Sequence, residues 1–469
     1  PALDAARAAP AIAIKQAGDP ADPKKSPGMI VPVILLAIGA AVAFLPPVGD
    51  LPLFGYISIG LLLAGGIAAM PLIARLMLSP FRRFNFPASI DLALKHLWGA
   101  PGQAAIALCG MVASTSLMIA MAVMIWSFRN SVDAWLVQVL PSDIYVRVDS
   151  DDGDALTPDI QQRLTQIPGV VQIHFRKNTP LRLAPERPPV DWMATAVKDR
   201  NPVGILPMIG EILPTPAGAI PVWVSEPAHW IYGYTPGQWI RLPIGDRNSR
   251  RFFIAGEWRD YGRPQGAIAM SLADYTALTG DETRTDAAID VARGTDKHRV
   301  MDEVRTVLPP EVARNVTIAD SRTIRALSLH IFDRSFAVTY LLEGIAILVG
   351  LAGIAATFSS QTLARSKEFG MLRHVGVLRR QILAMLAMEG AMLGVVGVVA
   401  GMVLGLAISQ ILIQVINPQS FHWTMDVRLP GTLFISVAVA MIAASAGTAL
   451  IAGRKALSRD SVLAVREDW

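Results

Sequence analysis

The sequence predicts an α-helical multi-pass membrane protein with six transmembrane helices and an inserted α/β extracytoplasmic domain. Three observations predict this class. Hydrophobic residues make up 52% of the 469 residues and charged residues only 17%, whereas soluble domains are about a quarter charged. Six apolar stretches are long enough for a bilayer core of about 30 Å, which needs about 20 helical residues. One long polar region, residues 140–333, separates the third stretch from the fourth.

The apolar stretches exceed the usual length of a helix in a soluble protein, about 10–14 residues. They lie at residues 26–49, 51–74, 97–128, 335–364, 390–417 and 429–453. Their length alone therefore argues for membrane spans and against buried helices of a soluble core.

The distribution of Lys and Arg predicts the orientation of these spans. Basic residues cluster at 15–25, 75–95, 365–380 and 454–466, whereas the turn at 46–52 has none. Short loops rich in Lys and Arg stay on the cytoplasmic side. We therefore expect a protein of the cytoplasmic (inner) membrane with both termini in the cytoplasm. The large polar region is then extracytoplasmic, since a domain of this size is translocated whatever its charge.

Within the polar region, short strands alternate with helices. Alternating side chains predict a strand at 143–149, and Thr157-Pro158 is typical of a helix start. A hairpin is expected around 246–249 and a second helix at 297–308. The pattern predicts an α/β domain of one or two lobes. An aromatic group in its middle is expected to pack in the core rather than to line a groove for an apolar ligand: Trp223, Trp230, Tyr232, Tyr234, Trp239 and Trp258.

The sequence contains no pattern that predicts catalysis or metal binding. It has no G-x-x-x-x-G-K-[ST] loop for phosphates, no G-x-S-x-G elbow and no H-E-x-x-H pair. Its single cysteine, Cys109, excludes an internal disulfide, and no Cys/His cluster offers a zinc site. Catalytic residues and metal ligands are therefore not expected. The basic residues flank apolar runs instead of forming one stripe, so the net charge of +4 indicates a membrane surface and not nucleic acid.

The cytoplasmic connection LARSKEFGMLRHVGVLRRQIL, residues 363–383, combines a basic face with an apolar one. Its Lys and Arg residues are attracted by anionic lipid, and its two glycines permit a tight bend. Apolar contact is offered by Phe369, Met371, Leu372 and Val375. These features suit either a docking element for another protein or an ordinary basic loop.

This connection resembles the signature R-x-x-E-[IF]-G-x-L-R-x-x-G of the FtsX-like (MacB/LolC-type) ABC transporter permeases. The matching residues are Arg365, Glu368, Phe369, Gly370, Leu372, Arg373 and Gly376. Upstream, residues 89–110 resemble the amphipathic helix that precedes the family's first membrane span. Ser89 is its expected N-cap, and its apolar face is formed by Ile90, Leu94, Leu97 and Trp98. The resemblance covers about residues 90–469, with the signature specific and the polar domain only loosely similar.

The resemblance implies the domain order of the C-terminal half of a ten-span member. Residues 1–28 would be the cytoplasmic tail of a preceding permease unit, 29–78 two linker transmembrane helices and 79–100 the cytoplasmic amphipathic helix. Residues 101–130 would form the third transmembrane helix and 131–333 the extracytoplasmic domain. The FtsX-like core would be 334–469, with spans four to six, a coupling loop at 362–383 and a cytoplasmic C-terminal tail.

The resemblance also implies a mechanical function. A separate ABC ATPase would bind ATP, so that this chain needs no cofactor and is not itself an enzyme. The ATPase would dock on the signature loop and the amphipathic helix, and its motion would pass through spans three and four to the outer domain. That domain would export or extract a lipophilic or peptide-like substrate. Other expected partners are a second permease copy or a related permease, membrane lipid, and an extracytoplasmic adaptor, hydrolase or substrate protein. The alternative is a regulator that activates a cell-wall hydrolase or a sensor without transporting a substrate.

Polar residues inside the apolar stretches are further candidates. Glu343 is costly inside a membrane unless it faces protein or water, and Ser114-Thr115-Ser116 on the third stretch is its expected partner. The contact would act as interhelical glue or, if formed in one state only, would time the motion. Glu389, near the cytoplasmic start of the fifth stretch, is expected to snorkel or to pair with Arg379 or Arg380.

Overall fold

A computed structural model describes residues 28–49, 51–80, 88–99, 101–149, 155–197, 201–244 and 250–458. The chain forms two compact units, which we call the helical unit and the α/β unit. The helical unit comprises Pro1–Met124, Val338–Val415 and Leu429–Trp469, and the α/β unit comprises Ile125–Ala337 and Ile416–Arg428. The expected tails at 1–27 and 459–469 lie outside the described residues, as does the hairpin turn expected around 246–249.

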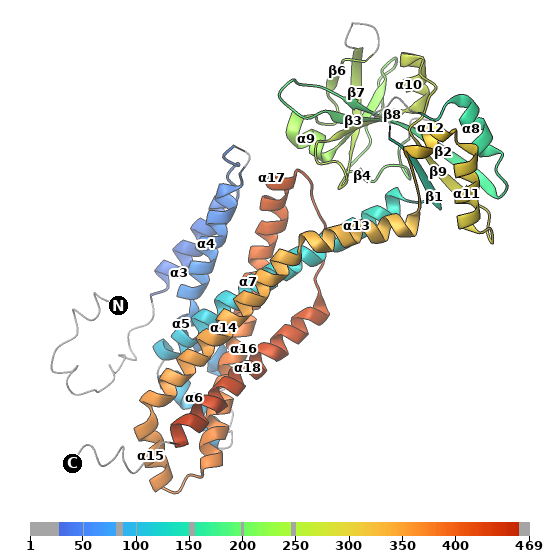
Figure 1. The fold of residues 1–469 in the computed structure, drawn as a ribbon. Helices are drawn as coiled ribbons and strands as arrows, with labels where there is room; N and C mark the ends of the chain where they lie inside the picture. The colour runs from blue at the N-terminus through green and yellow to red at the C-terminus, as the bar shows by residue number, and fades with distance from the viewer. Residues whose placement is uncertain are drawn as a thin grey trace. The chain divides into compact units, whose positions relative to one another are not determined.

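The helical unit is built from apolar helices that the composition predicts (Figure 1). Its elements are α3 (Ile30–Val42), α4 (Leu53–Ala68), α5 (Met70–Leu78), α6 (Ala88–Gly99), the first part of α7 (Pro101–Val139), α14 (Ala337–Ala364), α15 (Ser366–His374), α16 (Arg379–Ile411) and α18 (Gly431–Ser458). A π-helical turn, η3 (Leu412–Ile416), and α17 (Asn417–Phe421) continue directly from α16.

Four helical segments of the described chain are long and apolar enough to cross a membrane. They are Leu108–Val139, Ala337–Ala364, Arg379–Phe421 and Gly431–Lys455. Helices α4 and α5 pass the same test together but are bent by 50° at their junction, where Pro71 in the first turn of α5 lacks a backbone donor. Helix α3 has 13 residues and is about 20 Å long, which is shorter than a bilayer core of about 30 Å. The expected number of six spans is therefore not confirmed.

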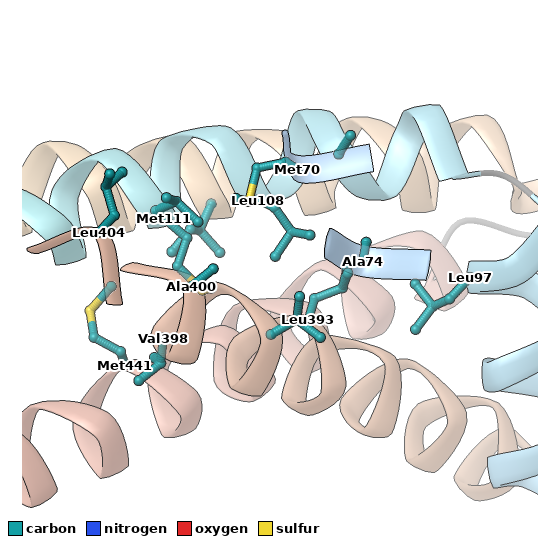
Figure 2. Close-up of a cluster of buried hydrophobic side chains, with 14 of the residues drawn as sticks. Met70, Ala74, Leu97, Leu108, Met111, Leu393, Val398, Ala400, Leu404 and Met441 are labelled. Atoms are coloured by element: carbon teal, nitrogen blue, oxygen red, sulfur yellow. The ribbon is translucent and has the colours of Figure 1, made fainter. Parts of the chain in front are cut away.

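The core of the helical unit lies where α16 meets α5, α6, α7 and α18 (Figure 2). Leu108 and Met111 of α7 are almost completely buried, as are Leu393 of α16 and Met70 of α5. Glycines of α16 allow these close contacts. An added Cβ at Gly405 would lie 2.6 Å from the carbonyl oxygen of Ser116. The third and fifth predicted spans therefore pack with almost direct backbone contact.

The α/β unit contains one ten-stranded sheet. Its strand order is β10-β1-β9-β2-β3-β8-β5-β7-β4, and β6 also pairs with β7. The β3–β8 and β5–β7 pairs are parallel, and the other pairs are antiparallel. The strands are β1 (Ile144–Val148), β2 (Val170–Leu181), β3 (Val190–Thr195), β4 (Met208–Ile209), β5 (Pro221–Ser225), β6 (Trp239–Leu242), β7 (Arg250–Trp258), β8 (Ala267–Ser271), β9 (Asp286–Val291) and β10 (Val316–Asp320).

The helices of this unit cover the two ends of the sheet (Figure 1). Apolar side chains of β1, β9 and β10 pack with α8 (Pro158–Thr165), α11 (Lys297–Val307) and α12 (Pro310–Arg314). A second cluster joins β3, β5, β7 and β8 to α9 (Glu226–Tyr232) and α10 (Leu272–Thr279). One continuous sheet thus carries separate hydrophobic cores at its two ends. Helix α13 (Ser321–Ser335) follows β10 directly and leads into α14.

Most of the elements predicted in the polar region are confirmed. The expected strand at 143–149 is β1, and the helix after Thr157-Pro158 is α8. The expected helix at 297–308 is α11, between β9 and β10. The aromatic prediction is only partly right. Trp223 and Trp258 are fully buried, whereas Trp230 and Trp239 are 47% and 45% exposed.

A segment far along the sequence, Ile416–Arg428, belongs to the α/β unit. Its Trp423 packs against Tyr261, with ring centroids 4.7 Å apart. The backbone N–H and hydroxyl of Thr424 donate to the buried carboxylate of Glu226. The backbone N–H of Arg428 donates to the Ser127 hydroxyl at 2.9 Å. These polar contacts join residues up to 301 positions apart, and no local pattern in the sequence indicated them.

Candidate functional site

The signature residues form a short helix, α15, between α14 and α16. Gly376 has a φ of 100°, a left-handed conformation that suits glycine because it has no Cβ. The chain turns there and enters α16, whose first turn is capped by Gln381: its side-chain oxygen accepts from the backbone N–H of Leu378 at 2.9 Å. The bend expected from the sequence is therefore confirmed at Gly376.

Arg365 connects α15 to α16. Its Nε donates to Glu368 at 3.1 Å, and its Nη1 donates to both carboxylate oxygens of Glu389, at 3.3 and 3.1 Å. The side chains of Arg365 and Glu389 are only 12% and 5% exposed. The expected snorkelling of Glu389, or its pairing with Arg379 or Arg380, is thus replaced by a pair with Arg365. A charge-assisted contact of this kind holds the short helix rigidly on the long one.

The apolar residues of α15 and of the turn that follows it, up to Leu378, divide into an inward and an outward set. Phe369 is 1% exposed and packs with Ala93 of α6 and with residues of α16. Met371, Val375 and Leu378 are 63%, 85% and 64% exposed. The expectation that Phe369 offers a surface for a partner is therefore wrong, because its ring is buried within the helical unit. We call Met371, Val375 and Leu378 the outer apolar patch.

Helix α6 packs beside α15 through Ala93, which the sequence analysis did not single out. Leu94 and Leu97 are each 4% exposed and belong to the core of the helical unit. Helix α6 begins at Ala88, so the expected N-cap Ser89 lies inside the helix. The side chains of Ser89, Ile90 and Trp98 are not among those described. The structure thus brings α6 and the signature helix together, with Ala93, Leu94 and Leu97 turned inward and Leu92 exposed.

The predicted contact of Glu343 is not formed. Glu343 is partly exposed and makes no hydrogen bond to Ser114, Thr115 or Ser116 in the described chain. Ser114 instead lies against Gly350, two turns further along α14. Ser114 on α7 thus lies beside the middle of α14, whereas Glu343 lies near the start of α14.

The serine and threonine cluster packs helices together. An added Cβ at Gly401 would lie 2.7 Å from the Cβ of Thr115, and the Ser116 hydroxyl donates to the carbonyl of Ala113 at 3.1 Å. Small polar residues permit such close helix contacts in membranes. Within the described ranges, no group of three or more His, Cys, Asp and Glu residues is arranged to hold a metal ion.

Sequence comparison decides which family contains this helical arrangement. Residues 340–460, which cover most of α14 and all of α15 and α16, match the model of the family described as FtsX-like permease C-terminal. Residues 340–460 of this chain thus match an FtsX-like permease C-terminal domain. The signature at Arg365–Gly376 lies inside the matched residues and agrees with this match.

Two curated relatives of this chain are described as ABC transporter permeases. An uncharacterised ABC transporter permease protein of Mycobacterium tuberculosis is 25% identical over 386 residues, covering 76% of this chain and 42% of the relative. An uncharacterised ABC transporter permease of Methanocaldococcus jannaschii is 23% identical over 215 residues, covering 43% of this chain and 53% of the relative. The chain spans about half the length of the curated relatives it matches.

Solved structures similar to the chain are extracytoplasmic domains. The periplasmic region of MacB from Actinobacillus actinomycetemcomitans aligns with 40% of this chain and 94% of that structure, at 10% identity and a TM-score of 0.29. The extracellular domain of the noncanonic ABC-type transporter YknZ from Gram-positive bacteria aligns with 38% of this chain and 99% of that structure, at 12% identity and a TM-score of 0.27.

Proposed function

We propose that this FtsX-like chain is the permease component of an ABC transporter whose ATPase is a separate polypeptide. The ATPase docks on α15, and its motion is transmitted through the membrane helices to the α/β unit, which exports or extracts a lipophilic or peptide-like substrate. The observation that carries the proposal is the Arg365 bridge, which joins the signature helix to α16 through Glu389.

The geometry of α15 suits the transmission of force. A docking element can move a membrane helix only if its attachment does not yield when it is pushed. Arg365 supplies a charge-assisted attachment, and Phe369 supplies a packed one. On its outer side, α15 presents an apolar patch for a groove in the partner, as amphipathic helices do in other complexes.

The continuity of two helices supports the second half of the proposal. Helix α7 runs without interruption over 39 residues, from Pro101 to Val139, and α14 follows α13 after one residue. Within the α/β unit, Arg325 of α13 binds Asp133 of α7 through two contacts of 2.7 Å. This ion pair joins the end of α7 to α13, and in the proposal the two helices transmit the motion together. In this proposal, α15 is cytoplasmic, the α/β unit is extracytoplasmic, and the transporter contains two permease subunits in the inner membrane.

The proposal is tested by placing a charge in the outer apolar patch. Val375→Asp puts a carboxylate on a side chain that is 85% exposed, which costs little for folding but opposes burial in a partner's groove. The chain is purified with the ABC ATPase that accompanies it from native membranes and reconstituted into nanodiscs. We expect Val375→Asp to lose most of the ATPase subunit and the ATP hydrolysis that depends on the permease.

The matched control is Val171→Asp, an exposed valine on β2 of the α/β unit. It introduces the same charge and is expected to retain both the ATPase and its activity. Wild-type ATPase binding and hydrolysis in Val375→Asp would contradict docking on the patch. Hydrolysis without movement of any substrate, together with activation of a bound hydrolase, would favour the regulatory alternative.

A further inference from the structure

The α/β unit contains a cavity of about 720 Å³. Its walls come from the end of α7, from α13 and from one face of strands β1, β2, β3, β9 and β10. Small-molecule sites in proteins have volumes of about 300–1,000 Å³, so this cavity is large enough for a ligand of that class.

The strands present polar side chains to the cavity because their apolar side chains face the other way. Ile144 and Val146 of β1 are buried in the cluster with α8 and α11, and side chains alternate between faces along a strand. Arg147 therefore lies on the cavity side of β1. By the same alternation, Arg176 and Asn178 lie on the cavity side of β2, about 7 Å apart along the strand. All three residues line the cavity.

The carboxylates of Asp286 and Asp191 at the cavity already accept hydrogen bonds from neighbouring side chains. Asp286 accepts from Arg147 Nε at 2.9 Å, from Asn178 Nδ2 at 2.7 Å and from Thr285 Oγ1 at 2.7 Å. On the neighbouring wall, Arg263 binds Asp191 at 3.0 Å and Asp260 at 2.9 Å. Asp286 and Asp191 thus have cationic partners other than Arg176, and the exposed Asp149 is the third carboxylate among the described residues that line the cavity.

Two polar atoms on the cavity side of β2 lack a partner. The Nε of Arg176 and the Oδ1 of Asn178 are buried without a hydrogen bond among the described residues. The orientation of the Asn178 amide is set by its Nδ2, which must face Asp286 because a carboxylate only accepts. Burial lowers the pKa of Arg176, partly offset by the nearby Tyr145 and Asp286. An unpaired buried donor and acceptor are costly, and a ligand that binds both would remove that cost.

The opposite wall of the cavity is apolar. Leu136 and Val139 come from the last turns of α7, and Ile324 and Phe332 from α13. Trp135 also lines the cavity, and its Nε1 is satisfied by the carbonyl of Arg259 at 3.0 Å. This wall therefore favours a hydrocarbon surface of the ligand.

The geometry points to a binding site for a single-chain amphiphile whose head carries an anionic group and an adjacent N–H donor, as an N-acyl amino acid does. The anion binds Arg176, the N–H donates to Asn178, and the acyl chain lies against α7 and α13. Arginine suits a carboxylate because its planar donors match the two oxygens. The inference names a substrate class for the proposed permease and in that respect rests on the proposed function. Binding is measured without ATP or ATPase, so a failure of either idea leaves the other separately testable.

The site is tested on the full chain in nanodiscs of neutral phosphatidylcholine. An N-acylglycine with a photoreactive diazirine in its acyl chain labels the protein, and N-lauroylglycine competes. We expect the labelled peptides to map to the end of α7 and to α13. Two analogues remove one contact each: the methyl ester of N-lauroylglycine lacks the anion, and N-lauroylsarcosine lacks the N–H. We expect each analogue to compete about tenfold or more weakly than N-lauroylglycine. The methyl ester leaves the buried Arg176 without an anion, and N-lauroylsarcosine leaves the Asn178 oxygen without a donor.

Variants assign these differences to residues. Arg176→Met should weaken competition by N-lauroylglycine about tenfold or more and should abolish its advantage over the methyl ester. Asn178→Ala should abolish its advantage over N-lauroylsarcosine. Ser328→Trp, at a small residue of α13 that lines the cavity, should block labelling. Arg299→Met is the matched control, because Arg299 lies on α11, is 75% exposed and does not line the cavity.

Equal competition by all three amphiphiles on the wild-type chain would overturn the inference, and this comparison requires no variant to fold. Labelling confined to the membrane-spanning helices would also overturn it, because it would report partition into lipid. Gel filtration and thermal unfolding establish that each variant is folded before it is compared. Equal affinity of Arg176→Met and Arg299→Met for N-lauroylglycine would exclude Arg176 as the anion-binding group.

Discussion

Replacement of Gly405 by alanine should destabilise the helical unit. A Cβ at this position would lie 2.6 Å from the carbonyl oxygen of Ser116 and 2.8 Å from the Cβ of Ile119, both on α7. A backbone oxygen and a Cβ cannot move aside by a change of rotamer, so the two helices must separate. Gly447 on α18 provides a matched control, because a Cβ there would have no atom within 4 Å.

Two opposing terms set the size of the effect. In a helix interior, alanine is more favourable than glycine by about 0.5–1 kcal/mol, and Gly447→Ala should show this gain alone. Overpacking of a close contact costs about 1–3 kcal/mol. We therefore expect Gly405→Ala to have a free energy of unfolding about 1–3 kcal/mol lower than that of Gly447→Ala.

The free energy of unfolding is measured in mixed micelles by titration with sodium dodecyl sulfate, with helix content followed by circular dichroism. The comparison between the two alanine variants cancels the intrinsic difference between glycine and alanine in this solvent. If Gly405→Ala were as stable as Gly447→Ala, α7 and α16 would not be packed with direct backbone contact, and the close-packing argument would fail.

Three further predictions follow from the charged and exposed residues. Arg365→Met removes the charge-assisted hydrogen bonds that Arg365 donates to the buried Glu389 and should lower the free energy of unfolding by about 3–5 kcal/mol. Glu389→Gln in the same chain should recover part of this loss, and purely additive effects in a double-mutant cycle would contradict the bridge. Burial raises the pKa of Glu226, so the Glu226 carboxyl keeps its proton to a higher pH in the folded protein than in the unfolded chain. The free energy of unfolding therefore falls as the pH rises above the ordinary Glu pKa of about 4.3. Glu226→Gln should flatten that fall, as measured by unfolding between pH 5 and pH 8, and an unchanged pH profile would contradict it. Cysteines placed at Val171 and at Val375, in a chain without its native cysteine, should be labelled from opposite sides of the membrane by an impermeant reagent; equal labelling in intact spheroplasts would refute the proposed topology.

Local patterns in the sequence were sufficient for the elements whose side chains repeat with a helix or strand period. The apolar stretches predicted α7, α14, α16 and α18, and alternation predicted β1. The sequence determined the length of each helix less well. The first apolar stretch contains enough residues for a span, but its helix covers only Ile30–Val42. Pro46 and Pro47 follow shortly after that helix, and a count of apolar residues does not register where backbone hydrogen bonding stops.

The signature predicted where a coupling helix lies but not which of its side chains face outward. Phe369 and Val375 are both apolar and lie less than two turns apart, yet one is 1% exposed and the other 85%. The difference depends on packing against other helices, because Phe369 is buried among Ala93 of α6 and apolar residues of α16 and α18. The partner of Glu389 was missed for a related reason. Arg379 and Arg380 are closer in sequence, but the turn at Gly376 brings Arg365 back onto α16.

The sequence by itself therefore determined the membrane class, the α/β character of the polar region and the family signature, because each depends on composition, period or local spacing. Only the tertiary structure decided that Ile416–Arg428 packs within the α/β unit, that Arg365 holds Glu389, and that Arg176 borders a cavity with its Nε unbonded among the described residues. The first two features join residues that are 24 to 301 positions apart. The third arises because Asp286 already accepts a hydrogen bond from Arg147. Such pairings follow from the packing of whole elements, and the free energy that selects them is not encoded in any one segment.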